Sequence, residues 1–245
     1  MKRHIPNLIT LINLLSGTIA VMLGVEGNLV LAGVFVLIGI FFDFFDGLVA
    51  RILNVQSELG KQLDSLADMV TCGVVPGIIM YQLLKQSSVL WNEEGLPPTS
   101  LFTEGISYLP LLGLIITLAA AYRLANFNID ERQSTSFIGL PTPAATLFVI
   151  SLPFITQYNT CDFAVELIQN KWFLIAVTLV LSYLMNANIR LFSLKFKDFS
   201  FKNNLIKYVF ILLSIVLLVW LQFVAIPIIV VLYVLFSVVE NLMKK

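Results

Sequence analysis

The sequence predicts an all-α fold, a polytopic integral membrane helix bundle with about eight transmembrane helices. Hydrophobic residues make up 58% of the 245 residues, and the mean hydropathy is +0.92. A water-soluble domain does not reach these values. Charged residues account for only 12% of the chain and fall mostly between long apolar stretches, while the net charge is zero.

Eight apolar stretches are expected to form the membrane-spanning helices. The first six cover residues 8–25, 29–50, 62–84, 108–127, 139–158 and 172–185. The stretch from 205 to 242 is too long for one crossing, so we divide it near residues 222–227 into two further helices. The expected connections are a turn at 26–28, a polar loop at 85–107 containing Pro97-Pro98, a loop with Asp162 and Glu166, and a basic loop from Arg190 to Lys207.

The first apolar stretch follows a basic start and could be taken for a secretory signal. No clear small-x-small cleavage site follows it, and Asn7, Thr10 and Asn13 recur at every third position. A polar stripe of this kind on an apolar helix points into a bundle. We therefore expect this segment to remain as the first transmembrane helix.

Four carboxylates interrupt the second and third apolar stretches. Asp43 and Asp46 fall on one helical face, and Asp64 and Asp68 lie one turn apart on the next helix. Ionisable groups inside a membrane span are costly and indicate a functional site. Carboxylates at this density repel each other unless a divalent ion, or two, neutralises them. Oxygen ligands favour Mg²⁺ or Mn²⁺ over zinc.

Cysteine and histidine offer no competing metal site. The two cysteines, Cys72 and Cys161, lie far apart in the chain and form neither a disulfide framework nor a metal knuckle. His4 is the sole histidine and stands in the N-terminal tail.

The residues beside the acids suit a phosphate group. Gly47 and Ala50 leave room there, and the guanidinium of Arg51 can donate two parallel hydrogen bonds to a phosphate. Together these features suggest metal-assisted phosphoryl chemistry.

The acidic segment resembles the signature of a known enzyme family. The pattern D-x-x-D-G-x-x-A-R-x8-G-x3-D-x3-D is complete from Asp43 to Asp68. It is similar to the motif of the CDP-alcohol phosphotransferases, membrane enzymes that displace CMP from a CDP-linked donor with an alcohol. Residues 5–13, 123–128 and 137–144 resemble one branch, the bacterial and archaeal CDP-diacylglycerol–serine O-phosphatidyltransferases. The resemblance covers about residues 5–150, and the last hundred residues carry no matching motif.

This resemblance implies transfer of a phosphatidyl group from CDP-diacylglycerol to L-serine, which gives phosphatidylserine and CMP in phospholipid biosynthesis. It also implies a homodimer, a catalytic core over residues 1–190, and an addition at 191–245 that holds the basic loop and two C-terminal helices.

Chemistry and resemblance together assign the site residues as follows. Asp43, Asp46 and Asp64 are expected to hold the first ion, and Asp68 either completes a second position or faces it. By resemblance, Asp68 is the general base. The CDP donor is expected to lie against Asp43, Gly47, Ala50, Arg51 and Gly60.

The acceptor is expected to bind at the end of the fourth helix, through Arg123, Asn126 and Asn128. An arginine fork is suited to the carboxylate of serine. Two structural interpretations stay open: Arg123 could only anchor the helix at the membrane surface, and the asparagines could only cap its end. Gly47, Ala50 and Gly60 could likewise serve only in helix packing.

The basic residues predict the orientation in the membrane. With eight helices and the N-terminus inside, every Lys and Arg except Lys85 and Lys171 falls on the cytoplasmic side. We therefore expect an integral protein of the bacterial or archaeal cytoplasmic membrane, with the N-terminus and active site on the cytoplasmic side. Membrane lipids are expected partners and nucleic acid is not.

Three other functions are compatible with parts of the pattern. The same scaffold could use another alcohol acceptor, such as glycerol phosphate or inositol phosphate, which would call for more basic residues near the site. An intramembrane prenyltransferase also binds Mg²⁺-diphosphate through aspartates, but its motifs lie far apart in sequence. A cation transporter would use buried acids without needing the small residues and Arg51.

Overall fold

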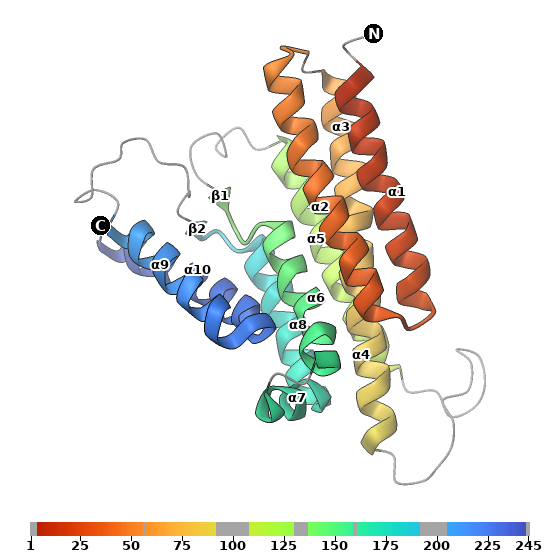
Figure 1. Cartoon of the computed structure of the whole chain (residues 1–245), viewed down its shortest axis with the longest axis vertical. Coiled ribbons are helices and arrows are strands. Elements are labelled where there is room, and N and C mark those ends of the chain that lie inside the picture. The colour runs from red at the N-terminus through yellow and green to blue at the C-terminus, as the bar shows by residue number, and fades with distance from the viewer. Residues whose placement is uncertain are drawn as a thin grey trace.

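The computed structural model describes residues 4–55, 57–91, 108–129, 137–158, 161–191 and 205–243. These residues are almost entirely helical (Figure 1). In the first half of the chain the elements are α1 (Ile5–Val25), α2 (Leu29–Ile52), α3 (Glu58–Asp68), a π-helical turn η2 (Met69–Val74), α4 (Val75–Trp91), a 3-10 segment η3 (Leu109–Leu114) and α5 (Ile115–Ile129). The second half contains β1 (Phe137–Ile138), α6 (Thr142–Tyr158), α7 (Asp162–Gln169), α8 (Lys171–Asn186), β2 (Arg190–Leu191), α9 (Leu205–Leu221), η5 (Gln222–Val224) and α10 (Ala225–Met243).

The predicted polytopic helical membrane protein is confirmed, and each of the eight apolar stretches corresponds to a helix. Within the described residues, five helical segments are long and apolar enough to cross a membrane, or six when the bent pair α7–α8 counts as one span. α6 is slightly shorter at 17 residues. The 36-residue stretch Lys207–Leu242 counts as one of the five, although it is divided into α9 and α10.

The break between α9 and α10 confirms the predicted division near residues 222–227. Gln222 takes a positive φ of 47°, and the chain folds back there. Phe210 of α9 contacts Tyr233 and Phe236 of α10, with ring centroids 5.9 and 6.1 Å apart. These contacts join residues at similar distances from the break, so the two helices form an antiparallel hairpin.

Three sequence expectations were wrong or incomplete. α4 continues to Trp91, so the polar loop begins later than Lys85. The predicted loop around Asp162 and Glu166 is the helix α7, which meets α8 at 82°. The sequence also gave no sign of β1 and β2, which pair antiparallel and join the start of α6 to the end of α8. Pro97-Pro98 and most of the basic loop lie outside the described residues.

Local side chains define the helix starts near the acidic segment. Asn28 caps α2 by accepting a hydrogen bond from the Leu31 backbone N–H at 3.3 Å. Ser57 caps α3 in the same way, accepting from the Gly60 N–H at 3.1 Å. Such caps satisfy amides that the first helical turn leaves without partners. Gly27 provides the positive φ of 86° that the tight α1–α2 turn requires.

α1 is the element on which the acidic segment is assembled. It packs along α2 and also contacts α3, whereas α2 and α3 make few direct contacts with each other. The predicted polar stripe of α1 points into the bundle, as Thr10 and Asn13 are 3% and 0% exposed. The backbones of α2 and α3 therefore stand apart from each other, and α1 lies beside both.

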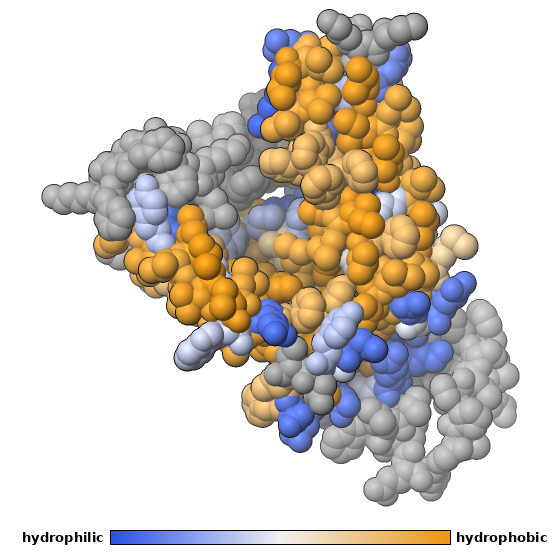
Figure 2. Space-filling view, viewed as in Figure 1, coloured by the Kyte–Doolittle hydropathy of each residue, from blue (hydrophilic) through white to orange (hydrophobic). Residues whose placement is uncertain are grey.

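The main hydrophobic core lies between α4, α5, α6 and α8. α6 is at its centre, with 11 of its 17 residues buried. The outer surface is also apolar: Figure 2 shows hydrophobic residues over the flanks of α1, α2, α9 and α10, and hydrophilic residues gathered toward the ends of the molecule. Such a surface suits a helix bundle surrounded by lipid.

Candidate metal centre and adjoining pocket

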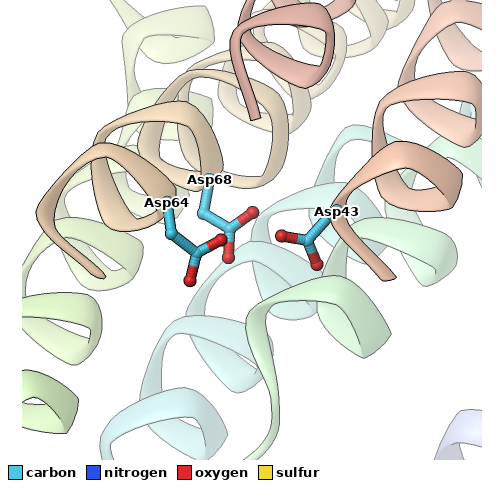
Figure 3. Close-up of side chains that lie close together, drawn as sticks. All are labelled: Asp43, Asp64 and Asp68. Carbon is cyan, nitrogen blue, oxygen red and sulfur yellow. The ribbon is translucent and has the colours of Figure 1, made fainter. Parts of the chain in front are cut away.

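Three carboxylates from two helices converge on one point. Asp43 of α2 faces Asp64 and Asp68 of α3, and one oxygen of each lies within 4.8 Å of the others (Figure 3). All three side chains are partly buried. The group contains only oxygen donors, which fits Mg²⁺ or Mn²⁺ and does not suit a soft-metal site. This cluster could therefore bind a divalent metal ion.

The helix geometry beyond Asp68 is irregular. The π-helical turn Met69–Val74 follows Asp68 directly. A π turn frees backbone carbonyls from their usual helical partners, and such turns occur frequently at functional sites. Thr146 of α6 donates to the Cys72 carbonyl, and Thr117 of α5 donates to the Gly73 carbonyl, each at 3.0 Å. Two neighbouring helices thus hold the turn that follows the acidic helix.

Asp46 lies outside the group of three. It is 6% exposed, and its carboxylate accepts a short hydrogen bond from the hydroxyl of Thr10 on α1. The two acids of α2 therefore differ in surroundings: Asp43 faces α3, and Asp46 faces α1. The sequence geometry had placed both on one face without distinguishing their neighbours.

A pocket of about 550 Å³ opens beside the carboxylates, between the N-terminal parts of α1 and α3 and the C-terminal end of α2. Gly47 borders it, and a Cβ added there would meet nothing within 4 Å. The pocket is lined by Pro6, Asn7, Thr10, Asp46, Gly47, Ala50, Arg51, Val55, Ser57, Glu58, Gly60, Lys61 and Asp64. It therefore brings together four of the five predicted donor-binding residues, Gly47, Ala50, Arg51 and Gly60.

Some residues of this pocket were not predicted as site residues. Asn7 and Thr10 belong to the polar stripe of α1, which sequence reasoning had used only to place that helix in the bundle. Lys61 had been counted only for its charge. The available signal was the three-residue spacing of the stripe, which repeats at a helical step and continues to Asn13.

The three predicted acceptor residues have different surroundings. Arg123 is 7% exposed; its Nη2 donates to the Gly139 carbonyl at 3.5 Å, and its Nε has no hydrogen-bond partner among the described residues. Asn128 ties α5 to α3, because its Nδ2 donates to the Ser65 hydroxyl at 2.8 Å. Asn126 is exposed and does not share the burial of Arg123.

The β1–β2 pair explains how Gly139 reaches Arg123. Gly139 follows β1 with a φ of 74°, and its N–H donates to the Ile189 carbonyl beside β2 at 2.9 Å. A Cβ at Gly139 would collide with the carbonyl of Met185. Gly139 thus forms a turn before α6, and this turn directs a carbonyl toward α5. Arg123 also interacts electrostatically with Asp68 and does not line the pocket.

Fold and site together define a polytopic helical membrane protein with a carboxylate centre beside a polar pocket. The profile of the CDP-alcohol phosphatidyltransferase family matches residues 3–184. This match covers most of the chain and includes every residue of the site. The chain therefore belongs to the CDP-alcohol phosphatidyltransferase family, whose members generally depend on a divalent metal ion.

Curated relatives agree with this assignment. The CDP-diacylglycerol–serine O-phosphatidyltransferase of Bacillus subtilis is 33% identical over 76% of this chain and 89% of its own length. The enzyme of the same name from Helicobacter pylori strain 26695 is 31% identical over 76% of this chain and 70% of its own length. The archaetidylserine synthase of Methanothermobacter thermautotrophicus is 29% identical over 60% of this chain and 56% of its own length.

Proposed function

We propose that this chain transfers the phosphatidyl group of CDP-diacylglycerol to the hydroxyl of L-serine, which releases CMP. The observation that carries the proposal is the convergence of Asp43, Asp64 and Asp68 at the edge of a pocket that contains Arg51 and Gly47. Family membership supports this reaction class. The names of the Bacillus and Helicobacter relatives support serine as the acceptor.

The carboxylates would hold one Mg²⁺ or Mn²⁺ ion, or two. The expected first set was Asp43, Asp46 and Asp64, but the oxygens that lie together are those of Asp43, Asp64 and Asp68. These three would hold the first ion, and Asp46 would supply a further oxygen on the side of the pocket. A bound divalent ion would neutralise charge on the pyrophosphate of the donor and on the departing CMP. Asp46 stays oriented for this role because Thr10 donates to its carboxylate.

The pocket residues would bind and orient the donor. Arg51 binds a phosphate of the CDP moiety through its planar fork of donors. Gly47, Ala50 and Gly60 present little side-chain volume, so the nucleotide can lie against α2 and α3. The apolar flanks of the bundle would leave the acyl chains of the donor in the surrounding lipid.

The acceptor would approach from the side of Asp68 that faces Arg123. Its carboxylate binds the guanidinium, whose Nε has no partner among the described residues. The serine hydroxyl oxygen then attacks the phosphorus that bears the diacylglycerol. The bond from that phosphorus to the CMP oxygen breaks, the serine proton passes to Asp68, and CMP leaves. With the CDP donor in the pocket and serine on the Arg123 side of the acids, the serine hydroxyl could displace CMP directly, without a covalent enzyme intermediate.

A panel of acceptors tests the proposal. Purified protein in detergent, with CDP-diacylglycerol and Mn²⁺ or Mg²⁺, should release CMP with L-serine and much less with glycerol 3-phosphate or inositol phosphate. Asp162→Asn provides a matched control, because this acid is exposed on α7 and lies outside the site. Release of CMP with another alcohol but not with serine would assign a different acceptor. Isotope uptake into proteoliposomes without CMP release would indicate a transporter.

We also propose that the active site faces the cytoplasm and that two chains form a homodimer. The distribution of Lys and Arg supports the orientation. The dimer rests on family resemblance alone, and cross-linking in native membranes followed by mass measurement tests it. A single monomeric species at every cross-linker concentration would count against the dimer.

A further inference from the structure

A buried amide on α1 faces the acidic centre. Asn13 is 0% exposed, and its Oδ1 accepts a hydrogen bond from the Thr71 hydroxyl at 2.8 Å. Its Nδ2 has no hydrogen-bond partner among the described residues. The Asp68 carboxylate lies near this amide, because Thr71, which contacts Asn13, follows Asp68 by three residues on the same helical segment. A buried donor without a partner is rare in proteins and calls for an explanation.

The orientation of this amide is defined by its two neighbours. The Thr71 hydroxyl donates, so it favours the amide oxygen on its side. The opposite end then presents N–H groups to a carboxylate, whereas the reversed amide would place two acceptors against each other. Thr71 belongs to the π-helical turn after Asp68, so the same turn carries the acid and the residue that orients the amide.

Two glycines make room for the pair of Asn13 and Thr71. A Cβ at Gly39 would lie 2.7 Å from Thr71 Cγ2 and 2.8 Å from Asn13 Oδ1. A Cβ at Gly17 would collide with the Thr71 hydroxyl. The close approach of α1, α2 and the π turn at this point is therefore built around the hydrogen bond between these two side chains.

We propose that Asn13 is a positioning residue for Asp68, with its amide oriented by Thr71. In this role the amide N–H would donate to one carboxylate oxygen of Asp68 and leave the other oxygen for a cation at the site. A neutral donor orients the acid without adding the positive charge that would oppose a cation at the site. This inference deepens the proposed function and rests on it for the role of Asp68.

Thr10 offers a parallel one turn earlier on α1. It donates to Asp46 of α2, while Asn13 faces Asp68 of α3. The polar stripe of α1 would thus orient one carboxylate on each of the two acidic helices. Groups that orient metal-binding carboxylates typically contribute 10- to 100-fold to metal affinity or activity.

Mn²⁺ binding, measured by electron paramagnetic resonance without substrates, tests the proposal. Asn13→Leu should weaken Mn²⁺ binding roughly tenfold and lower kcat, with little change in the KM for CDP-diacylglycerol. Ser16→Ala is the matched control, because Ser16 is also buried on α1 but donates to the Phe35 carbonyl away from the acids. This variant should bind Mn²⁺ like the unmodified protein.

The decisive measurement is the double variant. If Asn13 acts through Asp68, Asn13→Leu should weaken Mn²⁺ binding much less in an Asp68→Asn background than alone. Equal weakening in both backgrounds, or no weakening in either, would overturn the proposal. Because Mn²⁺ binding is read without substrate, an inactive protein in the serine assay would contradict the proposed function and leave this test intact.

Thr71 provides a second route in case Asn13→Leu does not fold. Thr71→Val removes the hydroxyl at nearly constant volume and should weaken Mn²⁺ binding in the same direction as Asn13→Leu. Thr71→Ser keeps the hydroxyl and should restore most of the affinity. Equal Mn²⁺ affinities for the Val and Ser variants would also overturn the proposal.

Discussion

At the scale of single residues, the four aspartates of the motif have different surroundings. Asp43, Asp64 and Asp68 share one small space, whereas Asp46 is held by Thr10 at the pocket side. Members of one sequence motif therefore take unequal positions in the fold. Substitutions of single acids should distinguish these positions.

Asp43→Asn and Asp64→Asn should each abolish CMP release while the protein stays folded in detergent. Each substitution removes an anionic oxygen from the group of three, which weakens the hold on a divalent ion. CMP release at saturating Mn²⁺ measures the loss, and size-exclusion chromatography checks the fold. Near-normal activity of either variant would remove that residue from the proposed metal set.

Gly47→Ala should separate binding of the donor from stability. A Cβ at Gly47 meets no protein atom, and alanine favours a helix over glycine by about 1 kcal/mol. The variant should therefore be at least as stable as the unmodified protein. If the nucleotide lies against this position, the KM for CDP-diacylglycerol should rise several-fold. An unchanged KM would assign Gly47 to helix packing only.

Arg123→Lys should affect the acceptor and spare the donor. Lysine keeps the charge but cannot form a two-point contact with a carboxylate. Loss of such a charged hydrogen bond costs about 2–3 kcal/mol, roughly 30- to 150-fold in kcat/KM for serine. Metal-dependent binding of CDP-diacylglycerol should stay nearly intact. A folded variant with an unchanged serine KM would leave Arg123 with a structural role only, as a buried donor to the Gly139 carbonyl.

At the scale of elements, the π-helical turn links the acidic helix to the core. Its Cys72 carbonyl depends on the Thr146 hydroxyl, and Thr146 is fully buried on α6. The turn is therefore fixed by tertiary contacts rather than by its own sequence. A change in α6 should be transmitted to the acids through this contact.

Thr146→Val should destabilise the protein and weaken metal binding together. The substitution leaves a buried carbonyl without a donor, which costs about 1–3 kcal/mol. Thr146→Ser retains the hydroxyl and serves as the control. Thermal unfolding in detergent and Mn²⁺ titration provide the two measurements. Destabilisation without any change in Mn²⁺ affinity would show that the turn does not position the acids.

At this scale, the sequence predicted the elements that depend on local residue patterns and missed those that depend on distant contacts. Apolar length alone predicted the helices, and a complete motif predicted which acids and small residues gather beside the pocket. α7 was missed because polar residues such as Asp162 and Glu166 suggested a loop. No local pattern predicted the π turn, the β1–β2 pair or the contact of Asn13 with Thr71, because each depends on residues that are distant in sequence.

At the scale of the whole molecule, the two ends of the bundle present different groups. One end brings together Arg51, Lys61 and the pocket, and Lys61 Nζ donates to the Asn128 carbonyl of α5 at 3.1 Å. The other end brings the α1–α2 turn close to Gln86 and Tyr158.

The division into a core at 1–190 and an addition at 191–245 stays a prediction, although the family match ends at residue 184.

Single cysteines at the two ends should show opposite accessibility in sealed vesicles. Asn54 lies in the exposed α2–α3 connection at the pocket end, and Asn28 lies in the exposed α1–α2 turn at the other end. By the distribution of basic residues, a membrane-impermeant maleimide should label Asn54→Cys only in inside-out vesicles and Asn28→Cys only in right-side-out vesicles. Cys161→Ser provides the background, and Cys72 can remain because it is buried. Labelling in the reverse pattern would place the active site on the outer side, where cytoplasmic CDP-diacylglycerol and serine could not supply it, and would contradict both the orientation and the proposed reaction.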